Sequence, residues 1–176
     1  MTDAPMESIL SGRVAELRKA FDQSFAEPVV SDAATSVDLI SLRLAGDPYS
    51  IRMTDIAGLF ADVKVTPCPS PIAELRGIAG FRGVLTPVYD LSAWLGYPTS
   101  TARWLVLDRD RALALAFDAF TGHFRVDPSA IVGREDSSSS RHVREIVRQA
   151  DTAWPVIDIP SIVAAIKKRL PQTAAS

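Results

Sequence analysis

Turn-forming residues divide most of this chain into short segments, and this spacing limits the folds that it can adopt. From Val37 onward, clusters such as Gly46-Asp47-Pro48, Gly96-Tyr97-Pro98 and Asp127-Pro128-Ser129 recur about every eight to twelve residues. A strand needs only about four to eight residues, whereas a packed helix is usually longer. The spacing therefore predicts a mainly β fold built from small barrels or a sandwich.

Side-chain alternation within these segments supports the β prediction. Residues 113–117 alternate bulky side chains with alanines, which suits a strand buried on both faces. Residues 42–44 and 49–53 alternate apolar and polar side chains on the two sides of a turn, which predicts a hairpin. Further strands are expected at five other apolar segments, namely 84–91, 104–107, 124–126, 143–149 and 154–159.

The two ends of the chain carry helical periodicity instead. Apolar residues between Ile9 and Phe25 recur at steps of three and four, and Pro28 ends this pattern. A second apolar stripe begins near Pro160 and is followed by basic residues at 167–169, which suit the negative end of a helix. We expect a helix at each end, and the first one either packs on its own domain or mediates self-association.

These patterns divide the chain into two parts. Residues 1–36 are expected to form an N-terminal helical extension and linker, because residues 30–36 are small and polar. Residues 37–176 are expected to form one β-rich domain of ordinary size. Within it, the polar tract 134–141 has no apolar residue and is expected to be an exposed loop.

Charge and composition exclude several classes of partner. Nineteen basic and 21 acidic side chains leave a net charge of -2, so nucleic acid is not expected as the main partner. The single cysteine, Cys68, excludes an intramolecular disulfide. The sequence has no apolar run near twenty residues, and residues 1–7 lack a basic segment before an apolar core. No direct membrane insertion is expected, and a cytoplasmic protein is predicted.

A search for catalytic chemistry finds no convincing site. The serines at 137–140 lie in a polar tract near His142, where hydrogen-bond geometry is hard to hold. A pair of Cys68 and His123 stays open, although a cysteine between two prolines usually only packs. Asp90 and Asp118 are interpreted as structural carboxylates that cap turns or accept backbone amides. We therefore expect no catalytic residue, no cofactor and no metal.

A glycine-rich segment stands out from the other turns. Gly77, Gly80 and Gly83 are spaced three apart just before a predicted strand, which indicates a tight backbone path with positive φ angles or close strand approach. Phe81 and Arg82 are expected to project from the tip of this turn. The turn is either an ordinary solvated hairpin or an interaction point, because aromatic residues and arginine are enriched at binding hot spots.

The same segment resembles the signature of a known family. The stretch Gly80-Phe-Arg-Gly-Val-Leu-Thr-Pro-Val-Tyr-Asp-Leu91 is similar to the N-L-R-G-x-x-x-P-V-x-D-L motif of CheW-like domains. The resemblance runs from Leu42 to about Leu170, and it includes Tyr49-Ser50-Ile51 followed by Ile56-Ala57-Gly58-Leu59. Weaker similarities lie at residues 117–131 and at the closing segment 154–159.

The resemblance implies a fold and a function. Such domains fold as two small SH3-like barrels of about five strands each, here flanked by an N-terminal and a C-terminal helix. They have no catalytic residues and act as adaptors. They bind the regulatory domain of a CheA-type histidine kinase and the tip of a methyl-accepting chemoreceptor. By position, the resemblance assigns partner binding to Ile56, Gly58, Leu59, Gly80, Phe81, Arg82 and Gly83.

Three departures from the family pattern bear on the partner. Gly58 stands where the family often has a glutamate, Gly80 replaces the usual asparagine, and Phe81 replaces the usual leucine. One alternative is therefore an interaction module of the same fold in a non-chemotactic or single-interface system. An RNA-binding module is a further alternative, because residues 80–83 also fit a G-x-x-G loop. That loop normally joins two helices, whereas this one precedes a predicted strand.

Overall fold

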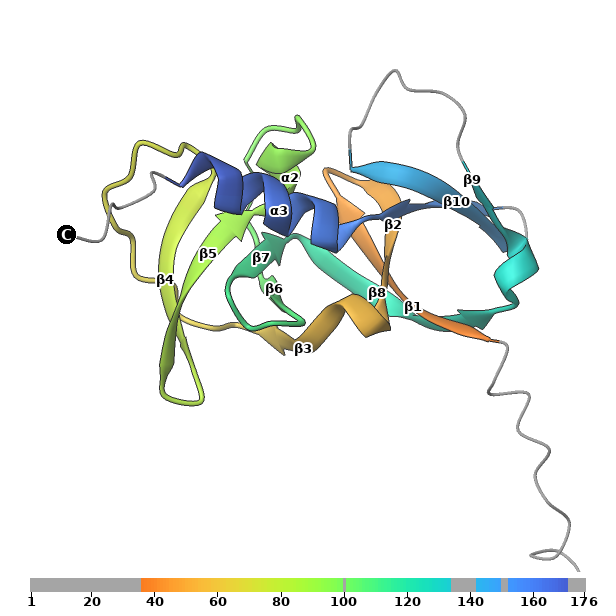
Figure 1. Cartoon of the computed structure of the whole chain (residues 1–176), viewed down its shortest axis with the longest axis horizontal. Coiled ribbons are helices and arrows are strands. Elements are labelled where there is room, and N and C mark those ends of the chain that lie inside the picture. Colours follow the sequence, from red (N-terminus) through yellow and green to blue (C-terminus); the bar gives the residue numbers. More distant parts are fainter. Residues whose placement is uncertain (1–35, 100, 134–141, 150–151, 171–176) are drawn as a thin grey trace, which may run out of the picture. The chain divides into compact units, whose positions relative to one another are not determined.

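The computed structural model describes residues 36–99, 101–133, 142–149 and 152–170 (Figure 1). The predicted N-terminal extension lies outside the described residues, apart from Ser36 at its end. The polar tract 134–141, with its serines at 137–140, also lies outside them.

A six-stranded sheet forms one half of the described fold. Its strands follow the order β8-β1-β2-β11-β10-β9. Their bounds are β1 Val37–Leu44, β2 Asp47–Arg52, β8 Ala119–Val126, β9 Ile131–Gly133, β10 Val143–Gln149 and β11 Thr152–Ile157. The predicted hairpin is present, since β1 and β2 pair antiparallel with Leu42 opposite Tyr49. β11 then pairs parallel with β2, which brings the C-terminal part of the chain beside its first strands.

A five-stranded sheet forms the other half, in the order β3-β6-β7-β5-β4. Its strands are β3 Ile56–Ala61, β4 Leu75–Phe81, β5 Val84–Asp90, β6 Trp104–Asp108 and β7 Ala114–Phe117. All four residues of β7 are buried, as the alternation of bulky residues and alanines predicted. Pro87 of β5 pairs with Ile78 of β4, and the pairing of β5 with β7 begins only after it, at Val88. A proline fits this position because its missing N–H removes no bond to β7.

The predicted mainly β fold with a C-terminal helix is confirmed, with small differences. The resemblance implied five strands in each barrel, whereas the first sheet has six because the three-residue strand β9 adds to β10. The predicted strand 84–91 ends at Asp90, and Leu91 begins the short helix α2 (Leu91–Trp94). The predicted strand 154–159 ends at Ile157, and Ile159 already begins the helix α3 (Ile159–Arg169).

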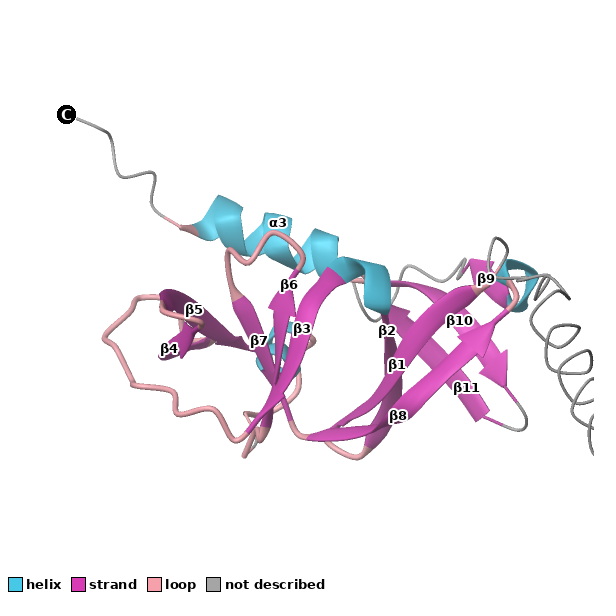
Figure 2. Ribbon diagram, turned by 90° about the horizontal axis from the view of Figure 1, so that it is seen from below, coloured by secondary structure: helices cyan, strands magenta, loops and turns pink. Residues whose placement is uncertain are grey.

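Helix α3 packs against both sheets, and Figure 2 shows it running along them. Its residues Ile159, Ile162 and Ile166 are almost completely buried. They belong to one apolar cluster with Ile51 of the first sheet and Leu115 of the second. Each fully buried isoleucine contributes about 1.5–3 kcal/mol. The helix therefore joins the two sheets through one shared apolar cluster.

The first turn of α3 is held by a side-chain cap. The Asp158 carboxylate accepts a hydrogen bond from the backbone N–H of Ser161 at 3.0 Å. Pro160 occupies the first turn, where its missing N–H costs nothing. Basic residues at 167–169 occupy the last turn, where they offset the helix dipole. Local sequence thus fixes both ends of the helix.

A smaller apolar cluster fills the five-stranded sheet, and it contains Phe81. The Phe81 ring is only 6% exposed and packs edge-on against Phe60 at 4.9 Å between ring centroids. The expectation that Phe81 projects from the turn is therefore wrong. Side chains alternate between the faces of a strand, so Phe81 points to the same side as the buried Ala79, two residues earlier.

Removing the Asp158 cap is expected to lower the stability of the protein measurably. Asp158→Ala should lower the free energy of unfolding by about 1 kcal/mol, because the Ser161 N–H loses its acceptor. Chemical denaturation measures this loss. Asp158→Asn is the matched control, since it removes the same charge but keeps an oxygen that can cap. Equal stability of the two variants would show that the cap contributes nothing.

Truncating Phe81 is expected to lower the free energy of unfolding more than loss of the Asp158 cap does. Phe81→Ala should destabilise the fold by about 3–5 kcal/mol, because it removes a buried ring from a packed cluster. Phe81→Leu keeps most of the apolar volume and should cost much less. Thermal unfolding of the two variants tests this difference. If the Phe81→Ala protein were as stable as the wild type, the buried position of Phe81 would be contradicted.

Candidate functional site

The signature segment forms a tight hairpin between β4 and β5. Phe81 pairs with Val84, so Arg82 and Gly83 are the two loop residues. Their φ angles are +50° and +85°, as in the turn that joins twisted strands with two residues. Glycine adopts this conformation freely, whereas a left-handed arginine costs roughly 1–2 kcal/mol. The turn therefore holds Arg82 in a strained backbone position.

The three glycines of this segment have different roles. Gly77 has a φ of +143°, and a Cβ atom there would lie 2.1 Å from the carbonyl oxygen of Thr66. Gly77 thus permits the close chain approach that the sequence predicted. Gly83 needs its positive φ for the turn. Gly80 has neither property, so the expectation of a constrained backbone is wrong at that residue.

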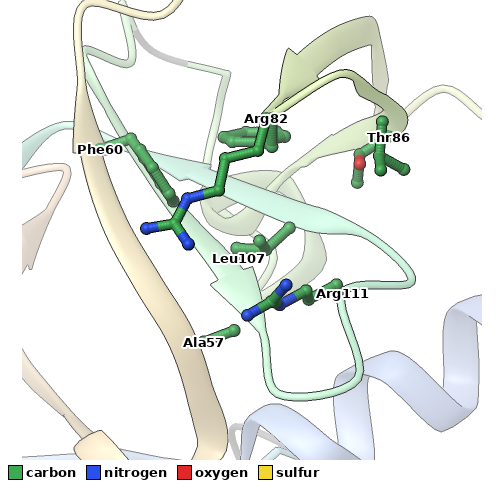
Figure 3. Close-up of a pocket in the computed structure, with 8 residues that line it drawn as sticks. Ala57, Phe60, Arg82, Thr86, Leu107 and Arg111 are labelled. Carbon is green, nitrogen blue, oxygen red and sulfur yellow. The ribbon is translucent and has the colours of Figure 1, made fainter.

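Arg82 lies on the wall of a small pocket, which we call the arginine pocket (Figure 3). Its volume is about 120 Å³. The lining residues come from strands and turns of the five-stranded sheet, and they are Ala57, Phe60, Phe81, Arg82, Val84, Thr86, Leu107 and Arg111. Apolar side chains form most of this wall, and the two arginines supply its charge.

A second, wider concavity lies where the two sheets meet, and we call it the apolar hollow. Its volume is about 390 Å³. β1 and β8 of the first sheet and β3 of the second all contribute to it. The lining residues are Ile40, Met53, Ile56, Ala57, Gly58, Leu59, Phe120 and His123. Met53 is 43% exposed, so an incoming apolar group would cover surface that now faces water.

The structure divides the predicted binding residues between these two concavities. The β3 residues Ile56, Gly58 and Leu59 line the apolar hollow. Phe81 and Arg82 line the arginine pocket. The lining of neither concavity includes Gly80 or Gly83. Ala57 lines both, so the two concavities meet along β3.

Sequence reasoning missed several lining residues. Met53 and Phe120 are far apart in the chain, and pairing of β8 with β1 brings Phe120 to the apolar hollow. Arg111 belongs to a polar turn after β6 and carried no motif. The one local signal was its charge in the run Asp108-Arg109-Asp110-Arg111, which is also typical of a solvated turn.

Gly58 links the two concavities sterically. A Cβ atom at this position would lie 2.9 Å from the ring of Phe60, two residues further along the strand. The Phe60 ring therefore lies over the place where the family often has a glutamate side chain. That ring also contacts Phe81 and lines the arginine pocket. A side chain at position 58 would force the Phe60 ring to move.

The rim of the apolar hollow carries a compact charged group. The Asp38 carboxylate contacts the Nε2 atom of His123 at 3.0 Å and the Nε atom of Arg125 at 2.9 Å. The hydrogen bond from Arg125 is the largest cause that lowers the pKa of Asp38 below its ordinary value. His123 thus contacts Asp38, and Cys68 contacts the carbonyl oxygen of the adjacent Pro69.

The carboxylates considered for catalysis have structural roles, as predicted. Asp90 accepts a hydrogen bond from the backbone N–H of Ala93 and pairs with Arg76 at 2.8 Å. Asp118 accepts a hydrogen bond from the backbone N–H of Ala45 at 2.8 Å. Within the described ranges, no group of three metal-binding side chains is assembled. Among the helices of those ranges, none has the length and apolar character needed to cross a membrane.

Comparisons with known proteins agree with this architecture. The family model described as the CheW-like domain matches residues 38–167. The chain is 24% identical over 149 residues to the chemotaxis protein CheW of Bacillus subtilis (strain 168), covering 77% of this chain and 92% of that protein. The crystal structure of the scaffolding protein TtCheW from Thermoanaerobacter tengcongensis has the same fold. Its TM-score is 0.62 at 20% identity, covering 69% of this chain and 88% of that one.

The family match covers most of the chain and includes both sheets and nearly all of α3. The two-sheet fold agrees with the solved relative. The chain therefore belongs to the CheW-like domain family of non-enzymatic scaffolds and is a distant relative of the chemotaxis protein CheW.

Proposed function

We propose that this protein is a cytoplasmic adaptor that couples a methyl-accepting chemoreceptor to a CheA-type histidine kinase. The observation that carries the proposal is the apolar hollow at the junction of the two sheets. It offers an unfilled apolar surface of the kind that receives an apolar ridge from another protein. The proposal assigns no reaction to the chain, since the adaptor acts by holding two partners together.

The apolar hollow suits a helical receptor tip. Its lining is mostly aliphatic and aromatic, so an apolar ridge placed there gains about 25 cal/mol for each Å² of apolar surface buried. Met53 at the edge is flexible and polarizable, which lets the surface adapt to its partner. Ile56 and Leu59 are only partly buried in the free chain and would become covered on binding.

The hairpin turn supports contact with a second group of the partner. Arg82 is presented beside Val84 and Leu85, which are 59% and 77% exposed. Arginine is enriched at binding hot spots, and the side chains around a hot spot serve mainly to exclude water from it. Gly83 holds the turn geometry, and Gly80 leaves open space beside it.

A second candidate is a domain of the same fold in a non-chemotactic or single-interface system. Gly58 favours it, because the charged contact of the family's glutamate is missing there. A pull-down that includes the kinase regulatory domain and the receptor tip separates the two. Retention of both partners supports the coupling role, and retention of only one supports the alternative. Retention of neither by the folded protein would contradict the coupling role and the single-interface system, and would support the non-chemotactic one.

We expect Arg82→Glu to weaken partner binding by tenfold or more while leaving the thermal transition nearly unchanged. A substitution of an exposed charge rarely changes stability by more than about 0.5 kcal/mol. Arg109→Glu is the control, because Arg109 is exposed in a nearby turn but does not line the arginine pocket. Unfolding of the Arg82 variant would make Arg82 a structural residue and would remove it from the binding site.

We expect Met53→Glu to weaken binding of the receptor tip and to spare the kinase regulatory domain. The substitution places a charge at the edge of the apolar hollow, where a bound apolar ridge would desolvate it. Titration calorimetry with each partner measures the two affinities. Val132→Glu is a matched control, since it adds the same charge to an exposed apolar residue outside both concavities. Unchanged receptor affinity of Met53→Glu would exclude the hollow as the receptor site.

A further inference from the structure

Two arginines from different turns converge on the arginine pocket. Arg82 comes from the turn between β4 and β5, and Arg111 comes from the turn between β6 and β7. Figure 3 shows both guanidinium groups extending toward the same space, with Leu107 between them. Two cations that face one space repel each other unless an anion lies between them.

Neither of these arginines has an acidic partner among the described residues. Five other arginines form ion pairs there, namely Arg52 with Glu145, Arg76 with Asp90, Arg103 with Asp62, Arg125 with Asp38 and Arg169 with Glu74. The salt bridges of the described residues do not include Arg82 or Arg111, and these two share one pocket. Gly58, which lines the neighbouring apolar hollow, brings no carboxylate to this part of β3.

Both arginines also occupy unfavourable backbone conformations. The φ angle is +50° at Arg82 and +57° at Arg111. Asparagine or glycine adopts this conformation at lower cost, and both are common in such turns. Strained backbone conformations are concentrated at functional sites, where the side chain has a role that favours keeping the strained residue. The two most strained positions of the pocket are thus the two that carry charge.

The apolar part of the pocket limits which chemical group could bind next to an anion held by the two arginines. Phe60, Phe81 and Leu107 give it an apolar wall. Its volume of about 120 Å³ suits a short aliphatic side chain; for comparison, an apolar cavity of about 150 Å³ holds benzene. A bare phosphate or a nucleic-acid backbone would leave this apolar surface unused, and the chain's net charge is -2. Charge and shape together favour a carboxylate next to an aliphatic group.

We propose that the arginine pocket binds an aspartate or glutamate side chain of a partner protein, held between Arg82 and Arg111, with an adjacent aliphatic side chain inserted into the pocket. The planar guanidinium group matches a carboxylate through two parallel hydrogen bonds. Binding would relieve the repulsion between the two arginines and bury the apolar wall. This inference deepens the proposed function, since it names the chemistry of the group that Arg82 contacts. Its test requires neither the kinase nor the receptor.

The direct test is a nuclear magnetic resonance titration of the full chain with short peptides. The probes are acetyl-Leu-Glu-amide and its uncharged counterpart acetyl-Leu-Gln-amide, and the readout is the arginine side-chain Nε–Hε signals. The glutamate peptide should shift the signals of Arg82 and Arg111 but not that of Arg109. The glutamine peptide should bind at least about tenfold more weakly, because hydrogen bonds to charged groups are the stronger ones. Equal binding of both peptides would overturn the proposal.

Asparagine tolerates the positive φ angles of both turns, so asparagine variants should stay folded and report on binding alone. Arg82→Asn and Arg111→Asn should each reduce binding of the glutamate peptide by about tenfold and leave the thermal transition unchanged or raised. The double variant should lose less than the product of the two single losses, because both arginines hold the same carboxylate. Arg109→Asn should bind like the wild type. Full additivity of the losses would mean that the arginines contact separate groups and would contradict the proposal.

Two further arms separate this inference from its alternatives. Inorganic phosphate at the same concentration should shift the two arginine signals less than the glutamate peptide does. An equal shift would identify a general anion site and overturn the proposal. If kinase and receptor bind normally but the glutamate peptide causes no shift, this inference fails and the proposed function stands. If the peptide binds but neither partner does, the pocket chemistry stands and the proposed function fails.

Discussion

The apolar cluster that joins the two sheets through α3 is the interaction on which the rest of the structure depends. Ile162 and Ile166 are completely buried and share this cluster with Leu44 of the first sheet and Leu115 of the second. A small barrel alone buries little surface, so one common core stabilises both halves. The same core fixes β3 next to β1 and β8, which creates the apolar hollow. A binding surface assembled from both sheets thus follows from how the core is closed.

β3 is the strand through which the two concavities are connected. Leu59 lines the apolar hollow, Phe60 lines the arginine pocket, and Ala57 lines both. The Phe60 ring lies over Gly58 and against Phe81, so its position depends on residues of both concavities. Groups bound on the two sides of β3 would therefore contact one continuous set of packed side chains.

Several of the described carboxylates organise structure, and the lining of the arginine pocket contains none. Asp90 and Asp158 cap helices, and Asp118 accepts a hydrogen bond from the backbone N–H of Ala45, directly after β1. Asp38 is held between His123 and Arg125 at the rim of the apolar hollow. Such satisfied groups give the surface a fixed charge pattern without reactivity. A scaffold works by presenting fixed contacts, and here the arginine pocket presents apolar surface with two cations while the apolar hollow presents mainly apolar surface.

The sequence by itself determined the local features. Alternation and turn spacing predicted the β fold and the buried β7, the stripe after Pro160 predicted α3, and the signature around Arg82 indicated the family. These features depend on neighbours along the chain. Tertiary structure decided that Phe81 faces inward, that Arg111 joins Arg82, and that Phe120 meets β3. Such contacts connect residues far apart in sequence, so their placement depends on strand pairing and a shared core, which no local pattern encodes.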